Sequence, residues 1–282
     1  MSETSYYADL HSHSTASDGQ WSPEAVVDAA ADVGLKALAL TDHDTLAGVE
    51  RAVARGKQRN IEVIPGCELT VYAGNRELHM LALFVDIKPN SALVKLLDEA
   101  RSARRGRVLK MGEQLRAAGI KVEDSDILEA GGETDALGQP HVAMALVKRG
   151  YGQNVGWAIR KYLHRGRPGF VEKKKFAPVE AIKAVHEAGG ITLQAHPGLS
   201  PHDELIAQLF RDGMDGVEAF HQTHSQVNRK FYAGLARRYE RAVSGGSDFH
   251  GPLVKPGVSL GSSGVSEEIF EDLRRRAYAR RK

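Results

Sequence analysis

Hydrophobic and polar positions in the first third of the chain follow two periods, one typical of helices and one of strands. Ser22-Pro23-Glu24 is a typical helix start, because serine can cap free N–H groups and proline suits the first helical position. The elements expected in this part are helices at 22–34 and 45–55, strands at 6–11, 35–40 and 61–71, and a hairpin over 71–85.

The pattern changes over residues 90–170, where helical periodicity dominates and no convincing strand is found. Alternation then resumes, with expected helices at 178–190, 203–213, 225–240 and 267–282 and expected strands at 191–197, 214–221 and 241–250. Helices that alternate with short apolar strands indicate an α/β fold with a parallel sheet or barrel. We therefore expect a main domain formed by 1–95 and 166–282, with a helical insertion at 96–165.

Composition narrows the class of protein. The 282 residues are 42% hydrophobic and 26% charged, as in ordinary globular domains. A formal net charge of +2 gives no overall polyanion-binding pattern, so long double-stranded nucleic acid is not an expected partner. The single cysteine, Cys67, suits a reducing compartment. With no apolar run near membrane-spanning length and no signal-peptide pattern, the sequence predicts a cytoplasmic protein without a membrane partner.

Histidine and acidic residues recur where the expected strands end. These residues are His11, His13, His43, Glu68, His196, Glu218, His221, Asp248 and His250, with Asp18 in a turn and His79 on the hairpin. The carboxyl ends of parallel strands meet at one edge, so we expect these side chains to converge. A lone histidine is usually structural, but so many imidazoles and carboxylates together predict a site for two or three Mn, Fe or Zn ions.

Seven short motifs carry a family resemblance. DLHSHS, LTDHD, PGCE, ELHMLALF, QAHP, GVEAF and GSDFHG, in this order, resemble the motifs of the PHP (polymerase and histidinol phosphatase) family and span residues 9–251. The resemblance implies a distorted, TIM-like (β/α)7 barrel with a di- or trinuclear metal centre. Matched motif by motif, it implies one ion at His11, His13, Glu68 and Asp248, a second at Glu68, His79 and His196, and a third at Asp18, His43 and His250.

The insertion and the segment that follows it, 161–198, resemble bacterial PHP enzymes of the TrpH/YciV type. That likeness implies hydrolysis of phosphoesters. The leading interpretation is a manganese-dependent phosphatase that converts nucleoside 3′,5′-bisphosphates such as pAp to AMP, with a metal-bridging hydroxide as nucleophile. The alternatives are a 5′→3′ exoribonuclease on short RNA, a histidinol phosphate phosphatase and a non-catalytic, metal-stabilised domain.

The mechanism implied by the resemblance suggests roles for further residues. Asp248 could orient the nucleophile, and His196 or His221 could assist proton transfer. The candidate substrate-binding residues are His221, Arg149, Lys161 and Arg165, of which the three cations could hold a second phosphate or simply be surface charges. Glu218 is a candidate support for the metal ligands. Cys67 is expected to be a small buried residue rather than a nucleophile.

Overall fold

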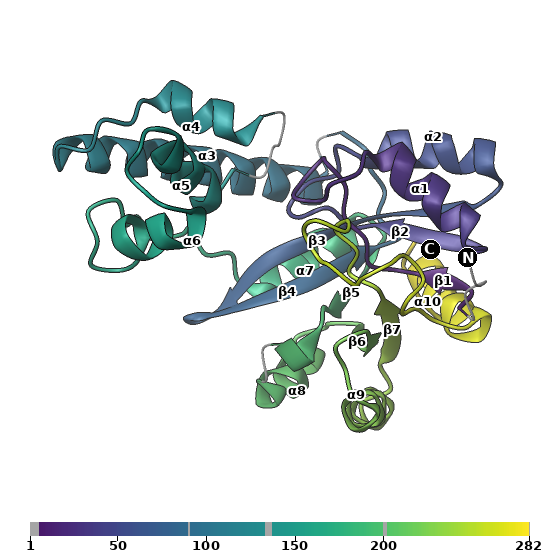
Figure 1. Ribbon diagram of the computed structural model, residues 1–282. Coiled ribbons are helices and arrows are strands. Elements are labelled where there is room, and N and C mark those ends of the chain that lie inside the picture. The colour runs from purple at the N-terminus through teal and green to yellow at the C-terminus, as the bar shows by residue number, and fades with distance from the viewer. Residues whose placement is uncertain (1–5, 90, 133–136, 200–201, 282) are drawn as a thin grey trace. The chain divides into compact units, whose positions relative to one another are not determined.

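The computed structural model describes residues 6–89, 91–132, 137–199 and 202–281. The chain divides into two compact units. One unit comprises Met1–Leu96 and Phe176–Lys282, and the other comprises Leu97–Lys175 (Figure 1). Among the described residues, no helix combines the length and the apolar character needed to cross a bilayer.

Seven strands in the first unit form one sheet in which spatial order follows sequence order. The strands are β1 (Ala8–Asp9), β2 (Ala37–Leu40), β3 (Glu62–Ala73), β4 (Arg76–Leu83), β5 (Ile191–Gln194), β6 (Gly216–His221) and β7 (Ala242–Gly246). Strand β4 runs antiparallel to both β3 and β5, whereas the other neighbouring pairs are parallel. The reversed strand comes from the expected hairpin, which turns at Gly74-Asn75, where Gly74 has φ +65°.

Backbone hydrogen bonds join the first and last strands of this sheet. The Leu10 N–H donates to the Gly245 carbonyl over 3.1 Å, and the His13 N–H donates to the Phe249 carbonyl over 2.8 Å. The Asp248 N–H also donates to the His11 carbonyl over 2.8 Å. We call this junction between residues 10–13 and 245–249 the seam. The sheet is therefore a distorted barrel, which confirms the predicted α/β barrel class.

Helices of the first unit surround the strands (Figure 1). They are α1 (Pro23–Asp32), α2 (Val49–Arg59), α7 (Pro178–Glu187), α8 (Asp203–Arg211), α9 (Gln226–Arg238) and α10 (Glu267–Arg280), with a short 3-10 turn, η2 (Pro197–Leu199). Ser22 caps α1 as predicted, its Oγ accepting the Ala25 N–H over 3.2 Å. Helix α2 begins four residues later than expected, because Thr45 Oγ1 accepts the Ala47 N–H and closes a turn there instead.

Apolar side chains fill the barrel and the layer outside it. Leu81 and Leu193 are fully buried inside the barrel, and Phe270 from α10 packs against the same cluster. A second cluster joins α1 to β2, where Val26 and Leu38 are fully buried. Burying a leucine or phenylalanine side chain contributes about 1.5–3 kcal/mol. This packing fixes the strands, and with them the positions from which the functional side chains project.

The second unit contains helices, and no strand is found among its described residues. Its elements are most of α3 (Ala92–Ala117), then α4 (Asp124–Gly131), α5 (Gln139–Lys148), α6 (Val155–Ala158) and a π-helical turn, η1 (Ile159–Leu163). They enclose a separate core that includes Met111, Leu115 and Leu146. The unit therefore has a hydrophobic core of its own, as an independently folded insertion requires.

Candidate metal centre

Two imidazoles and two carboxylates meet beside the ends of β1 and β7, where Glu68 projects from the middle of β3 rather than from the strand end expected for it. The Nε2 atoms of His11 and His13 lie 3.1 Å apart, and each lies 3.2 Å from Glu68 Oε2. Asp248 Oδ1 is 3.5 Å from both of these nitrogens. Four ligands placed tetrahedrally around one ion at about 2.1 Å are separated by about 3.4 Å. This first donor set therefore has the spacing of ligands to a single ion.

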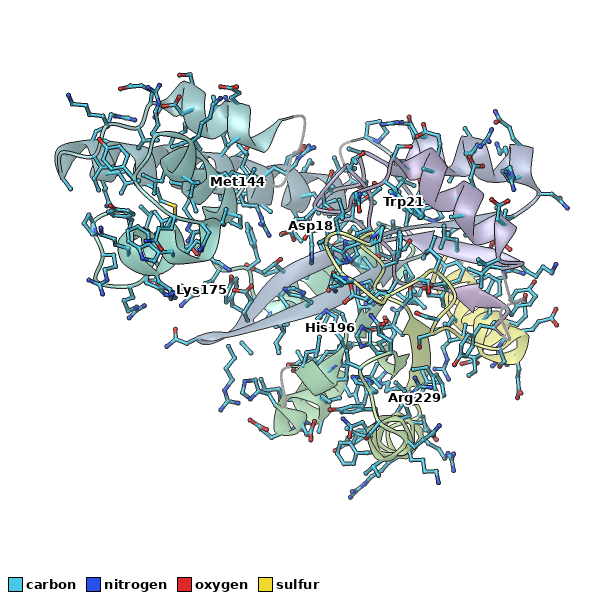
Figure 2. All side chains as sticks on the ribbon, viewed as in Figure 1. Asp18, Trp21, Met144, Lys175, His196 and Arg229 are labelled. Carbon is cyan, nitrogen blue, oxygen red and sulfur yellow. The ribbon has the colours of Figure 1, made fainter. Side chains whose placement is uncertain are left out.

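The other oxygen of Glu68 serves a second donor set. Glu68 Oε1 lies 2.9 Å from His79 Nδ1 and 2.9 Å from His196 Nε2. His43 also approaches Glu68, with its Nδ1 3.3 Å from Oε2. Because the two oxygens of one carboxylate face different histidines, Glu68 is placed to bridge two ions. Figure 2 labels His196, which belongs to the first unit.

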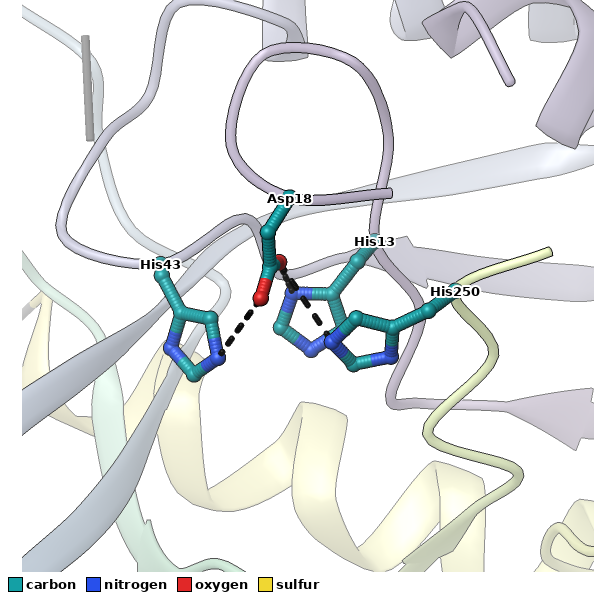
Figure 3. A group of neighbouring side chains, drawn as sticks. All are labelled: His13, Asp18, His43 and His250. Carbon is teal, nitrogen blue, oxygen red and sulfur yellow. Dashed lines mark ion pairs between the residues drawn. The ribbon is translucent and has the colours of Figure 1, made fainter. Parts of the chain in front are cut away.

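Asp18 lies opposite three histidines and completes a third donor set (Figure 3). Its Oδ1 is 3.4 Å from His250 Nε2 and 3.7 Å from His13 Nδ1, and its Oδ2 is 3.9 Å from His43 Nε2. The rings of His13 and His250 stack with centroids 4.0 Å apart. His13 therefore presents one nitrogen to the first set and the other to the third. All nine predicted metal ligands lie in these three sets.

The electrostatics of the centre favour a cation. The nearby His43 and His11 hold the pKa of the Glu68 carboxyl well below its usual value, against the opposing effect of burial. Burial alone would lower the pKa of His13, but hydrogen bonds to Asp248 and Glu68 raise it to about 9. Burial lowers the pKa of His43 to about 4. The lowered pKa of Glu68 favours its carboxylate form, which is the form that binds a metal ion.

Two buried nitrogens supply an independent test of whether the residues fit metal ions. His13 Nδ1 and His43 Nδ1 are buried, and neither has a hydrogen-bond partner among the described residues. A buried polar atom without a partner costs about 1–3 kcal/mol. Both atoms belong to side chains of the donor sets, where a divalent ion would satisfy them. The mixed imidazole and carboxylate donors fit two or three ions such as Mn, Fe or Zn.

Further carboxylates hold the ligands in place. Glu218 Oε1 lies 3.0 Å from His11 Nδ1, and Glu218 Oε2 accepts the His196 N–H over 2.7 Å. Glu218 therefore contacts two metal ligands, as expected of a residue that supports them. Asp42 accepts three hydrogen bonds of 2.7 Å, from the N–H and hydroxyl of Ser14 and the hydroxyl of Ser17. Asp42 stands in the LTDHD motif, but its anchoring role was not predicted from the sequence. It fixes the loop that carries Asp18.

Unusual backbone conformations occur at three acidic or histidine positions near the centre. Asp44, His196 and Asp248 have φ values of 51°, 27° and 56°. Residues other than glycine rarely adopt positive φ, and such strain costs of order 1–3 kcal/mol. Hydrogen bonds offset this strain. At Asp44, for example, the side chain accepts the Thr70 N–H over 2.8 Å. Strained residues gather at functional sites because the surrounding structure holds a side chain in a required direction.

The predicted substrate-binding residues fall in two places. His221 is buried beside the donor sets, with its Nε2 3.4 Å from Asp248 Oδ2. The three predicted cations lie in the second unit, where Arg149 pairs with Asp126, Lys161 lies over the Trp157 ring and Arg165 pairs with Glu172. Their role in holding a phosphate stays a prediction.

Two other residues clarify the chemistry. Cys67 is fully buried, and burial raises its pKa well above the ordinary value, so it is unsuited to act as a nucleophile. Lys255, which sequence reasoning missed, places its Nζ 2.5 Å from Asp248 Oδ2. Its only sequence signal is that it closely follows the GSDFHG motif.

Comparison with known proteins identifies the family. The PHP domain family matches residues 9–147. A 5′-3′ exoribonuclease of Haemophilus influenzae is 35% identical over 250 residues, which cover 86% of this chain and 90% of that protein. The chain belongs to the PHP family. This finding confirms the resemblance carried by the seven motifs.

Other PHP relatives extend the comparison. A 3′,5′-nucleoside bisphosphate phosphatase of Chromobacterium violaceum is 34% identical over 249 residues, covering 86% of this chain and 87% of the relative. A solved structure from Bifidobacterium adolescentis, of a protein assigned to the metal-dependent phosphoesterases, superposes with a TM-score of 0.81. It is 28% identical, and the match covers 97% of each chain. The likeness therefore includes both units and supports the barrel with its insertion.

Proposed function

We propose that the protein is a manganese-dependent phosphatase that removes the 3′-phosphate of nucleoside 3′,5′-bisphosphates, converting pAp to AMP and phosphate. The observation that carries the proposal is the sharing of Glu68 and His13 between adjoining donor sets. Shared ligands suit ions a few ångströms apart, the arrangement that clamps a phosphoryl group. The 34% identity to a bisphosphate phosphatase supports this choice of substrate.

The residues of the chain have definable tasks in this reaction. Divalent ions held by the three sets would supply Lewis acidity and lower the pKa of a bound water. Glu218 orients His11, while Asp42 holds the loop that carries Asp18. Asp248 directs one oxygen to the first set and the other to His221. Such supporting contacts restrict the movement of ligands and so reduce the reorganisation needed during reaction.

A second candidate function is 5′→3′ exonucleolysis of short RNA. It is favoured by the 35% identity to the Haemophilus influenzae exoribonuclease, over much the same length as the phosphatase relative. Both reactions hydrolyse a phosphoester on a nucleotide and would use the same donor sets. The proposed partners are accordingly small nucleotides and, under the second candidate, short oligonucleotides. A cytoplasmic location is proposed from the single cysteine alone.

Product analysis of manganese-loaded protein would decide between these functions. The protein is offered pAp, a short 5′-phosphorylated oligoribonucleotide and histidinol phosphate in separate reactions, each with a chelated control. Chromatography that separates 5′-AMP from 3′-AMP identifies which phosphate of pAp has been removed. Rapid formation of 5′-AMP and phosphate supports the proposal. Stepwise mononucleotide release with pAp barely consumed favours the exoribonuclease, and turnover of histidinol phosphate alone refutes both.

Two variants show whether product formation belongs to this centre. Asp248→Asn removes a charge from the first donor set and is expected to abolish turnover. Lys88→Met is the matched control, because Lys88 is a surface residue that pairs with Asp86 over 2.6 Å. Its activity should equal that of the wild type. If Asp248→Asn is as active as the wild type, the measured hydrolysis does not take place at this centre.

A further inference from the structure

A lysine faces the centre from the loop that follows β7. The acidic residues at the centre are Asp18, Glu68, Glu218 and Asp248. Among the ion pairs of the described residues, their partners are histidines with one exception, the ammonium group of Lys255. Its side chain is 35% exposed, whereas that of Asp248 is 3% exposed. Lys255 therefore reaches from solvent to the edge of a buried site.

The loop is built to hold this lysine in position. The Lys255 N–H donates to the Gly251 carbonyl over 2.9 Å, which turns the chain back toward Asp248. Gly251 has φ +97°, and a Cβ there would lie 2.5 Å from Gln20 Cβ. Gln20 Oε1 in turn accepts the Leu253 N–H over 3.1 Å. The turn thus depends on a glycine and is anchored to the segment between Asp18 and α1.

The two oxygens of Asp248 face different surroundings. Oδ1 lies 3.5 Å from His11 and His13, within the first donor set. Oδ2 lies 2.5 Å from Lys255 Nζ and 3.4 Å from His221 Nε2. One carboxylate therefore links the donor set to a fixed positive charge. A lysine ammonium has three N–H donors and no acceptor, so one contact with Asp248 leaves two donors for another anion.

We propose that Lys255 contacts the phosphoryl group that is hydrolysed, donating to one of its non-bridging oxygens. The inference rests on the proposed function only in requiring a phosphate ester as substrate. The exposed flank of Lys255 lets an anion approach from solvent, and Asp248 holds the ammonium beside the donor sets. A positive charge there stabilises the negative charge that phosphoryl transfer spreads over these oxygens.

A purely structural role for Lys255 makes different predictions. If the lysine only held Asp248 in place, its loss would reduce the metal content, and phosphate binding to molecules that still carry metal would be unchanged. A substrate contact predicts weaker phosphate binding at unchanged metal content. The experiment must therefore measure metal content and phosphate affinity separately from turnover.

The test compares Lys255→Met, Lys255→Arg and the control Lys88→Met as manganese-loaded protein. Metal content is measured by elemental analysis, and the binding of inorganic phosphate by titration calorimetry. Lys255→Met is expected to bind phosphate about 10- to 150-fold more weakly, the range for losing a hydrogen bond to a charged group. Lys255→Arg should retain most of the affinity, since arginine also binds phosphate. Lys88→Met should match the wild type in both measurements.

Two results would overturn the inference. One is that Lys255→Met, at full metal content, binds phosphate within about threefold of the wild type. The other is that it loses metal and this loss alone explains its weaker binding. Calorimetry requires no turnover, so the inference and the proposed function can fail separately. Wild-type protein that binds phosphate through Lys255 but leaves pAp intact would refute the function alone. Wild-type protein that hydrolyses pAp, with Lys255→Met equally active and equally able to bind phosphate, would refute the inference alone.

Discussion

Replacing Asp42 with alanine tests whether the loop that carries Asp18 is held by a single buried carboxylate. Asp42 is 2% exposed and accepts hydrogen bonds from the Ser14 N–H, the Ser14 hydroxyl and the Ser17 hydroxyl, each 2.7 Å long. Asp42→Ala removes all three acceptors and leaves their donors without this partner. The third donor set should then lose its fixed geometry, because Asp18 follows directly after Ser17.

The magnitude follows from the number of bonds and their charge. A hydrogen bond to a charged group contributes about 1.5–3 kcal/mol, so three would sum to about 5–9 kcal/mol if they were independent. They share one carboxylate, and water can enter the space that alanine leaves. Contributions within one network are not additive. We therefore expect the free energy of unfolding to fall by about 3–5 kcal/mol, which is less than the independent sum.

Urea unfolding of chelated protein would measure this change in the first unit alone. The chain has two tryptophans, Trp21 in the first unit and Trp157 in the second. In a Trp157→Phe background the fluorescence comes from Trp21, which packs on Phe249 with ring centroids 4.9 Å apart. The unfolding transition then reports the barrel rather than the insertion. Calorimetric titration with Mn²⁺ would show whether the variant binds one ion fewer than the wild type, as loss of the third donor set predicts.

The control is Asp32→Ala, which removes an aspartate whose side chain is 50% exposed and pairs with Arg59. Exposed ion pairs contribute about 0–1 kcal/mol, so this variant should unfold close to the wild-type midpoint. If Asp42→Ala costs less than about 1 kcal/mol and binds as many ions as the wild type, the anchoring role is wrong.

Four further predictions concern the centre and the core. Gly246→Ala places a Cβ 2.4 Å from His11 Cβ and should abolish metal loading in elemental analysis, whereas Gly234→Ala, with open space around it and an ordinary backbone conformation, should load normally. Hydrogen bonds and charges raise the pKa of His13 to about 9 against the effect of burial. Protonated His13 therefore stabilises the fold fully below about pH 6.5, and this stabilisation is lost as the pH rises through 9. The urea midpoint of chelated protein should accordingly fall between pH 7 and 10. An unchanged midpoint would contradict this prediction. Leu81→Ala should lower the free energy of unfolding by about 2–5 kcal/mol, measured by urea unfolding. Chelation should abolish turnover and added Mn²⁺ should restore it, whereas activity that survives exhaustive chelation would exclude metal dependence.

Much of the barrel could be predicted because its signals are local. Alternating periods give the strands and helices, and Ser22 marks a helix start by its own hydrogen bond. The predicted start of α2 at residue 45 was wrong, because Thr45 closes a turn with a side-chain hydrogen bond that competes with the helix. Closure of the barrel at the seam depends on pairing between the two ends of the chain, which no local pattern specifies.

His11, His13 and Asp248 were accessible from the sequence because the carboxyl ends of parallel strands meet at one edge of a barrel. Glu68 was expected at a strand end but lies within β3, which continues to Ala73, and His79 lies within the antiparallel β4. The positions of Asp42 and Lys255 were not accessible in this way. Each acts through a loop whose course depends on contacts with another segment, such as Gln20 against Gly251. A charged residue in a loop has no periodicity from which its direction can be predicted.

Because the metal centre lies on the seam, a bound ion would also affect how the barrel resists force. The first donor set takes His11 and His13 from one side of the seam and Asp248 from the other. The hydrogen bond from the Ser247 N–H to Asp9 at the same place spans 238 residues of sequence. An ion bound there would act as a cross-link between the first and last strands, and closing a loop longer than 100 residues stabilises a fold by about 5 kcal/mol in the chain-entropy view. Under a stretching force applied to the chain ends, the barrel should therefore open at the seam, and at a higher force when manganese is bound.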